Sequence, residues 1–241
     1  MFEIDIPEKD PNLDQDEEWF VLRTAAREER LRIHDYDRIY EIPGLYEEII
    51  YRRLKCQSHQ VVCSMLMEGL RQAGEESRPL SVLELGAGNG VAGECLRSQL
   101  PCCSLVGMDI IPQARDAALR DRPGTYSDYH ILDLTQLRPD QESRLRSGKF
   151  NALVTVGSLG FGDIPTQAFA RALDLLEPHS WLAFNIKESF LEDTDRSGFR
   201  EILKSMTGQD LEFLQTRKYC HRYSLSGSPI HYRAFSGRIR S

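Results

Sequence analysis

The segment Val82–Gly93, with the sequence VLELGAGNGVAG, decides the fold. Its first four residues are apolar apart from Glu84, which is typical of a strand buried on both faces of a parallel sheet. Four glycines follow in the next eight residues. Glycine permits a sharp turn and the close approach of a ligand, and the helix that comes next offers free N–H groups. The segment therefore predicts a strand, a ligand-binding turn and a helix.

After residue 79, the chain repeats this alternation of short apolar runs and helical stretches. We predict strands at 81–85, 104–110, 129–134, 151–157 and 181–187, and helices at 90–99, 112–121, 136–147, 165–176 and 196–206. Five β-α units in succession indicate a doubly wound, mostly parallel α/β sheet of the Rossmann type. The extended runs 211–227 and 228–240 have no helix between them. They predict a C-terminal antiparallel hairpin that completes a seven-stranded sheet.

The chain before residue 79 has a different organisation. Residues 1–13 are acidic and are expected to form a flexible tail. Apolar and aromatic residues at helical spacing predict three further helices, at 14–33, 45–54 and 59–73. We therefore expect an N-terminal helical cap or lid at 14–78, followed by a ligand-binding domain at 79–241.

The glycine-rich turn fits two classes of cofactor. Gly88–Gly93 matches the fingerprint G-x-G-x-x-G, which holds the pyrophosphate of a nicotinamide dinucleotide. Gly86–Gly90 equally fits a loop that holds the methionine part of S-adenosylmethionine (SAM). Glu84 favours SAM, because a carboxylate so close to a pyrophosphate repels it by roughly 1 kcal/mol or more. An NAD-dependent oxidoreductase remains the less favoured alternative.

Three strand ends, VLELGAGNG, VGMDI and HILDL, together resemble the motifs of class I SAM-dependent methyltransferases. The resemblance covers about residues 79–241. It implies that Asp109 accepts hydrogen bonds from the ribose hydroxyls and that Asp133 meets the adenine amino group, with Ile110 and Leu134 as apolar walls beside the adenine. It also implies cofactor binding by Glu84, Gly86, Ala87, Gly88, Asn89 and Gly90.

The fourth predicted strand ends in the glycine-rich sequence VGSLGFGDIP. Ligands bind at the carboxyl ends of strands in such sheets, so Val156, Gly157 and Ser158 are expected to line the pocket under the methyl group. Methyltransferases of amino nitrogens often carry Asn/Asp-Pro-Pro-Tyr here, and its absence disfavours nucleic-acid adenine or glutamine as acceptor. The loop is similar to that of a methyltransferase-like branch that includes the Williams–Beuren region protein, a likeness that suggests no substrate.

Charged residues near the predicted strand ends are candidates for the chemistry of the methyl acceptor. Lys187, at the end of the fifth strand, is a candidate for binding an acceptor carboxylate, and Glu188 is a candidate for taking a proton. His221 and His231 are further candidate bases, because the hairpin that carries them often borders the acceptor site in this fold. No histidine pair has the spacing of metal ligands, so no metal is expected.

Tyrosines of the cap are candidates for closing over the ligands. Tyr36 and Tyr40 are expected to contact the cofactor, and Tyr46 is expected to contact the acceptor. An aromatic face attracts a sulfonium cation by ~0.5–2 kcal/mol. A lid would explain why more than 70 residues precede the first strand of the ligand-binding domain.

Composition limits the classes of function. The net charge of −7 and the pI of about 5.5 disfavour a nucleic-acid partner. Neither an apolar run of ~18 residues, nor a signal peptide, nor a disulfide framework is found, so a cytoplasmic protein without membrane contact is expected. We predict methyl transfer from SAM to an oxygen, nitrogen or sulfur of a small molecule, with release of S-adenosylhomocysteine (SAH). A protein side chain as acceptor and a catalytically silent binding protein of the same fold remain open, as does the oligomeric state.

Overall fold

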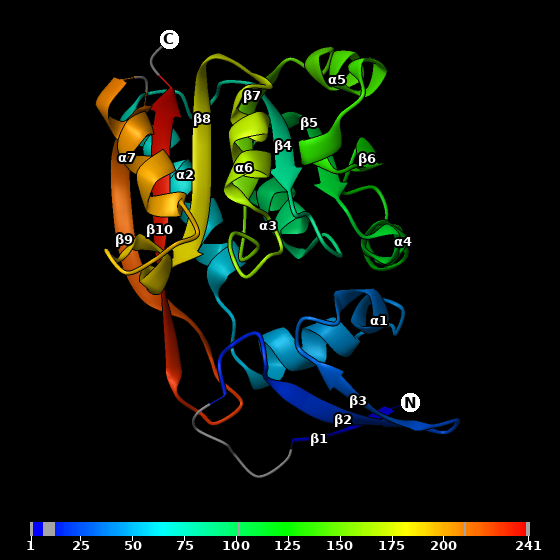
Figure 1. Ribbon diagram of the computed structural model, residues 1–241. Helices are drawn as coiled ribbons and strands as arrows, with labels where there is room; N and C mark the ends of the chain where they lie inside the picture. Colours follow the sequence, from blue (N-terminus) through cyan, green and yellow to red (C-terminus); the bar gives the residue numbers. More distant parts are fainter. Residues whose placement is uncertain (1, 7–12, 101, 210, 240–241) are drawn as a thin grey trace.

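A seven-stranded sheet forms the centre of the molecule (Figure 1). The computed structural model describes residues 2–6, 13–100, 102–209 and 211–239. The strand order is β6-β5-β4-β7-β8-β10-β9, in which β10 is antiparallel to both of its neighbours and the other pairs are parallel. The strands are β4 (Leu80–Leu85), β5 (Cys102–Asp109), β6 (Asp128–Ile131), β7 (Phe150–Thr155), β8 (Leu176–Lys187), β9 (Leu211–Tyr223) and β10 (Pro229–Ile239). The predicted doubly wound, mostly parallel sheet with a C-terminal hairpin is confirmed.

Helices cover both faces of this sheet. They are α2 (Ser58–Gln72), α3 (Val91–Gln99), α4 (Pro112–Asp121), α5 (Pro139–Arg146), α6 (Thr166–Leu173) and α7 (Phe199–Gln209), with 3₁₀ turns at Leu134–Gln136 and Glu188–Leu191. Side chains of β4 alternate between two hydrophobic cores. Leu83 and Leu85 join the core that contains Phe169 of α6, whereas Val82 joins the core that contains Leu66 of α2. Burial on both faces explains why the strand is an almost continuous apolar run.

The N-terminal segment forms a cap that differs from the predicted helical one. It contains β1 (Phe2–Asp5), β2 (Trp19–Thr24), β3 (Glu28–Arg32), α1 (Tyr36–Tyr40) and a π-helix (Glu47–Arg53). The helix predicted at 14–33 is wrong, because this stretch forms the antiparallel hairpin β2–β3. Phe20 and Leu22 are buried at a spacing of two, which is the period of a strand. Residues 2–5, expected in a flexible tail, pair with β2, and residues 7–12 lie outside the described residues.

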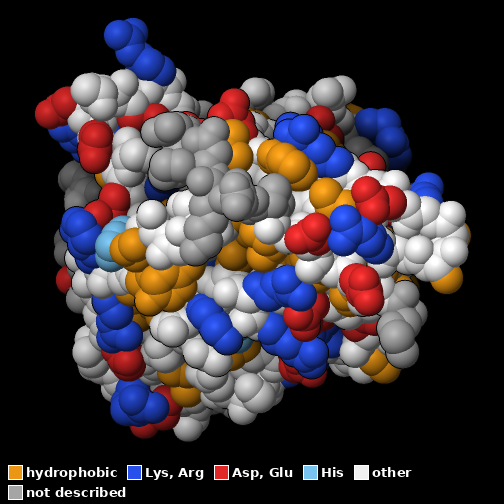
Figure 2. Space-filling view, turned by 90° about the horizontal axis from the view of Figure 1, so that it is seen from below, with side chains coloured by type: hydrophobic (Ala, Val, Ile, Leu, Met, Phe, Trp, Pro, Cys, Tyr) orange, Lys and Arg blue, Asp and Glu red, His pale blue; other side chains and the backbone are white. Residues whose placement is uncertain are grey.

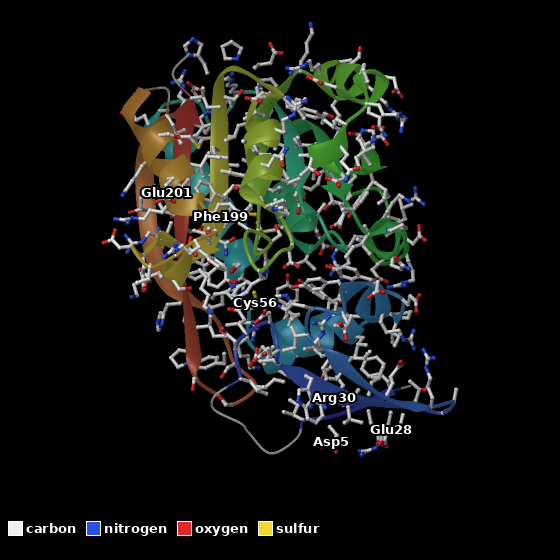
Figure 3. The ribbon with its side chains drawn as sticks, viewed as in Figure 1. Asp5, Glu28, Arg30, Cys56, Phe199 and Glu201 are labelled. Carbon is white, nitrogen blue, oxygen red and sulfur yellow. The ribbon has the colours of Figure 1, made fainter. Side chains whose placement is uncertain are left out.

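The cap has its own hydrophobic core and lies below the carboxyl ends of the parallel strands (Figure 1). Figure 3 shows Cys56 at the level where the cap meets the sheet, and Asp5, Glu28 and Arg30 on the far side of the cap. Seen from that side, acidic and basic side chains are interspersed among apolar ones (Figure 2). None of the described helices combines the length and apolar character needed to cross a membrane.

The hairpin β9–β10 extends beyond the central sheet and reaches the cap (Figure 1). The register of β10 with β8 runs from Tyr232 to Arg238, whereas Pro229–His231 pair with β9. This overhang binds the cap through an ion pair between Arg222 and Glu18, whose side chains are 2% and 3% exposed and 2.7 Å apart. The cap is therefore anchored to the hairpin.

Candidate active site

The first of two adjoining cavities lies between the strand ends and the cap. It encloses about 850 Å³ of space, part of which is open to solvent. Many of the predicted site residues lie in its wall: Tyr36, Tyr40, Tyr46, Gly86, Asp109, Ile110, Asp133, Leu134, Val156, Gly157 and Ser158. The fold thus brings together side chains from the cap and from the ends of several strands.

Asp109, the last residue of β5, has its carboxylate held by three backbone N–H groups. Oδ2 accepts from Gly88 at 2.9 Å, and Oδ1 accepts from Ile110 and Ile111 at 2.8 and 3.1 Å. Burial raises the pKa of this carboxyl, and the three hydrogen bonds act in the opposite direction because they stabilise its charged form. A carboxylate offers about four lone-pair sites, so Asp109 keeps acceptor capacity toward a ligand in the first cavity.

The glycine-rich loop packs tightly against both the cap and the loop after β7. Gly86 and Gly88 have φ angles of +68° and +54°, which L-residues rarely adopt. A Cβ on Gly86 would lie 2.5 Å from Ser158 Oγ, and a Cβ on Gly88 would lie 2.6 Å from the Tyr40 hydroxyl. Gly86 lines the first cavity, and the Tyr40 hydroxyl lies over Gly88. The other predicted loop residues do not line the cavity: Ala87, Gly88, Asn89 and Gly90.

A polar contact that the sequence did not reveal fastens the cap to this loop. Asn89 Nδ2 donates to Glu47 Oε1 at 2.7 Å, and Arg122 Nη2 lies 2.8 Å from the same oxygen. Arg122 Nη1 also donates to the Asn89 carbonyl at 3.1 Å. Asn89, predicted as a cofactor ligand, therefore holds the cap in this structure. The three residues lie far apart in the chain, and no local pattern signals their contact.

Glu84 is buried beneath the glycine-rich loop, outside the first cavity. Its Oε2 accepts a hydrogen bond from Tyr126 at 2.9 Å. Burial raises the pKa of Glu84 to about 8, although the Tyr126 bond lowers it. The carboxyl is therefore mostly neutral at pH 7, and the argument that its charge repels a pyrophosphate fails at that pH. Discrimination between the two cofactor classes must come from other features of the site.

Asp133 lies in the cavity wall and also caps the 3₁₀ turn that follows β6. Oδ1 accepts from the backbone N–H and the hydroxyl of Thr135 at 2.8 and 2.7 Å, and Oδ2 accepts from Gln136 Nε2 at 3.2 Å. Leu134 is buried, whereas Ile110 is 57% exposed. An apolar side chain so exposed at a cavity rim leaves surface for a ligand to cover.

The second cavity adjoins the first, and its space of about 530 Å³ includes volume that is open to solvent. The two share five lining residues, which are Tyr36, Tyr46, Val156, Gly157 and Asp163. The remaining wall comes from the cap, from the start of α2 and from the overhanging hairpin, through residues that include His34, Cys56, Ser58, His221, Arg222 and Tyr232. Gly157 is held in place because its N–H donates to Asn185 Oδ1 at 2.7 Å.

Asp163 lines both cavities and was not predicted as a site residue. Burial raises its pKa to about 7, and repulsion by Asp109 adds to this shift. Its Oδ2 lies 3.6 Å from His34 Nδ1, and burial lowers the pKa of that histidine to about 4. The pKa of this carboxyl is therefore near neutral pH, and the carboxyl lies between the two cavities. The sequence did offer one sign that Asp163 belongs to the site, because it is a carboxylate in the glycine-rich loop that follows a buried strand.

His221 is buried in the wall of the second cavity. Its ring stacks on Tyr232 with a centroid distance of 4.0 Å, and its Nδ1 lies 2.5 Å from Ser58 Oγ. Burial lowers the pKa of His221 well below its usual value, and the Arg222 charge contributes. The pairing register shifts between Ile230 and His231, which makes His221 the extra residue of a β-bulge in β9. A bulge re-aims side chains, and the neighbours His221 and Arg222 are accordingly both buried.

Three other predicted residues do not reach either cavity wall. His231 is exposed on β10, next to the inward-facing Tyr232. Glu188 lies between two cations, 2.5 Å from Lys218 Nζ and 2.9 Å from Arg233 Nη2, because the chain turns outward after β8.

Lys187, the third of these residues, lies 3.5 Å from Asp14 and 4.8 Å from the centre of the Phe161 ring. Phe161 itself lines the second cavity. Lys187 therefore supports this wall through an aromatic contact instead of facing a ligand.

A scan with protein-family models finds no match, and a search of curated proteins finds no significantly similar sequence. Solved structures share the fold. N-methyltransferase NodS from Bradyrhizobium japonicum WM9, in complex with SAH, has a TM-score of 0.57 at 14% identity, over 87% of this chain and 98% of NodS.

Two further structures match at a similar level. The Burkholderia thailandensis 1,6-didemethyltoxoflavin-N1-methyltransferase, with bound 1,6-didemethyltoxoflavin and SAH, has a TM-score of 0.54 at 14% identity, over 92% of this chain and 96% of that one. The CurJ carbon methyltransferase has a TM-score of 0.52 at 16% identity, over 76% of this chain and 55% of that one. The chain therefore has the Rossmann-like fold that these methyltransferases share.

Proposed function

We propose that this chain is a SAM-dependent methyltransferase that acts on an oxygen, nitrogen or sulfur atom of a small molecule and releases SAH. The observation that carries the proposal is the pair of adjoining cavities at the carboxyl ends of the parallel strands. A transfer between two molecules needs two such neighbouring spaces. The SAH found in NodS and in the toxoflavin-pathway enzyme of the same fold supports SAM as the methyl donor.

The residues of the first cavity fit SAM. Asp109 has spare lone pairs for the ribose hydroxyls, and Ile110 and Leu134 offer apolar surface for the adenine. The three cap tyrosines add aromatic faces, each worth ~0.5–2 kcal/mol to a sulfonium. When bound, SAM supplies an electrophilic methyl group whose bonding electrons return to sulfur as SAH leaves.

The second cavity is the proposed site of the methyl acceptor, and Asp163 is the proposed general base. Asp163 lines both cavities, and its pKa of about 7 makes its carboxylate available at neutral pH. It would take the proton that an O–H, N–H or S–H acceptor must lose, which contributes ~10²–10⁴-fold to the rate. Tyr36 and Tyr46 line both cavities and would exclude water. Alignment of the two reactants can lower the barrier by ~7–11 kcal/mol.

A small molecule suits this site better than a protein side chain does. Both cavities lie between the strand ends and the cap, and the cap is fastened at the glycine-rich loop and at the hairpin. A neighbour of the same fold carries 1,6-didemethyltoxoflavin as its bound small molecule. The likeness to the Williams–Beuren branch and the cytoplasmic location remain predictions from the sequence.

Parallel calorimetric titrations with SAM, SAH and NAD test the cofactor. We expect SAM and SAH to bind and NAD to give no heat. Asp109→Ala should weaken SAH binding by ~1.5–3 kcal/mol, the value of a hydrogen bond to a charged group. Asp116→Ala, which removes an exposed carboxylate on α4, is the matched control and should bind as the parent does. Binding of NAD alone would refute the proposal.

Turnover separates an enzyme from a silent binding protein of the same fold. The purified chain with SAM is incubated with phenols, carboxylic acids, amines and thiols, and SAH formation is measured. Asp163→Asn should bind SAH normally and lose most turnover. Tight SAM binding without SAH formation across the whole panel would favour the silent protein instead.

A further inference from the structure

Behind the wall of the second cavity, polar side chains form a continuous hydrogen-bonded chain. The backbone N–H of Gly157 donates to Asn185 Oδ1, which fixes the Asn185 amide so that Nδ2 points the other way. Nδ2 donates to Ser58 Oγ at 3.0 Å and to the Tyr219 hydroxyl at 2.7 Å. The two hydroxyls are 2.6 Å apart, and Ser58 Oγ reaches His221 Nδ1.

The direction of each hydrogen bond in this chain follows from counting hydrogens. Both hydroxyls already accept from Asn185, and one hydrogen lies between them. If Ser58 donated that hydrogen, the Tyr219 O–H would have no acceptor among the described residues. Tyr219 therefore donates to Ser58, and Ser58 donates to His221 Nδ1. This arrangement gives each N–H and O–H hydrogen of Asn185, Ser58 and Tyr219 an acceptor, as buried polar groups require. The Cys56 thiol, a weak donor, also lies beside Nδ1, with its sulfur 3.8 Å away.

His221 is consequently held in one tautomer. Its Nδ1 is an acceptor, so a neutral ring carries its hydrogen on Nε2. Burial lowers the pKa of His221, which keeps the ring neutral at pH 7. His221 lines the second cavity, and none of the described residues hydrogen-bonds Nε2. The buried chain thus leaves one hydrogen-bond donor for a ligand.

We propose that His221 recognises the methyl acceptor by donating a hydrogen bond from Nε2–H, and that Asn185, Ser58 and Tyr219 are positioning residues that hold this tautomer. This inference rests on the proposed methyl-transfer function. It replaces the role of base that the sequence suggested for His221, since a ring with a hydrogen on Nε2 cannot take a proton there.

The proposal defines a class of acceptor. One end of the acceptor molecule carries an oxygen, such as that of a carbonyl group, which accepts a hydrogen bond from His221. The other end carries the O–H or N–H group whose proton goes to Asp163. The walls between are aromatic, through Tyr36, Tyr46 and Tyr232, which favours a planar molecule. A phenol with a carbonyl group on the opposite side of the ring is the simplest member of this class.

Nitrogen NMR of the full chain tests the tautomer without any methyl transfer. In protein labelled with ¹⁵N-histidine, two-bond correlations at pH 7 should show His221 as the neutral Nε2–H form, with and without SAH. His231→Gln removes an exposed histidine and helps assignment. Ser58→Ala should release Nδ1 and mix the tautomers, whereas Ser64→Ala on the same helix should not. A parent spectrum with Nδ1–H or a charged ring would overturn the inference.

Binding of matched probes to the SAH-loaded chain tests recognition. 4-Hydroxyacetophenone should bind about tenfold more tightly than 4-ethylphenol, which lacks the carbonyl. His221→Leu should remove this preference, and His221→Gln, which keeps an N–H at a similar position, should restore it. Equal binding of the two probes to the parent would overturn the inference. If SAH itself does not bind, the proposed function is refuted instead. The NMR experiment then still tests the tautomer of His221 independently.

Discussion

The substitution Gly88→Ala tests the contact between the glycine-rich loop and the cap. Gly88 has a φ of +54°, which costs an L-residue ~1–2 kcal/mol, and replacing glycine returns ~0.4–1 kcal/mol by restricting the unfolded chain. The new Cβ would lie 2.6 Å from the Tyr40 hydroxyl, and forcing that side chain aside adds ~1–3 kcal/mol. We expect the free energy of unfolding to fall by about 1–4 kcal/mol, with the larger part due to Tyr40.

Two further variants separate the backbone cost from the contact. Gly44→Ala has a φ of +76° and no atom within 4 Å of the new Cβ, so it reports the backbone cost alone. In a Tyr40→Phe background the hydroxyl is gone, and the ring carbon that bore it would lie 3.4 Å from the Cβ, which is ordinary contact. Gly88→Ala should therefore cost little more than Gly44→Ala in that background.

Urea unfolding is measured for the parent, for Gly88→Ala, for Tyr40→Phe and for the double variant, with Gly44→Ala as the control. The differences give the coupling energy between positions 40 and 88. A coupling of about 1 kcal/mol or more would support the contact, because residues that touch commonly couple by ~0.5–3 kcal/mol. SAH affinity should fall in Gly88→Ala and recover in part with Tyr40→Phe. If Gly88→Ala and Gly44→Ala destabilise equally, or if Tyr40→Phe gives no relief, the cap does not rest on the loop as described.

Three other outcomes are expected. Asp163 has a folded pKa of about 7, above its unfolded value, so it makes stability fall as pH rises from about 4 to 7, and Asp163→Asn should flatten the measured unfolding free energy there. Glu84, with a folded pKa of about 8 against 4.5 when unfolded, makes stability fall from about pH 4.5 to 8; Glu84→Gln should flatten the profile over that whole range, and an unchanged profile would contradict the assignment. Glu18→Ala leaves buried Arg222 unpaired and should cost ~3–5 kcal/mol by urea unfolding, whereas Glu28→Ala in an exposed pair should cost under ~1 kcal/mol, and similar losses would argue against the buried pair.

The parallel part of the fold was predictable because its central strands β4, β7 and β8 are buried on both faces near their carboxyl ends. Such strands are apolar runs, and their alternation with helices along the chain indicates a parallel sheet. The glycines after β4 predict the turn that follows it. The stretch 14–33 was misread because Trp19, Phe20 and Leu22 fit a helical face as well as a strand, and only packing against the π-helix core separates the two.

The site was predictable where it depends on single strand ends and not where it depends on distant contacts. Asp109 follows a buried strand, so its place in the cavity could be expected. Ser58 and His221 lie 163 residues apart, and only the folded chain brings them into contact. Asp163 follows a strand end too, but it belongs to no motif that would single it out.

The bulge at His221 has a consequence for how the second cavity can change. In a regular strand, side chains alternate, so His221 and Arg222 would face opposite sides. The extra residue lets one side chain enter the cavity while the next anchors the cap. Losing a single codon at this place would restore regular pairing and leave only one of these two side chains in its present position. Related chains with an unbulged hairpin should therefore keep the methyl donor and differ in the acceptor.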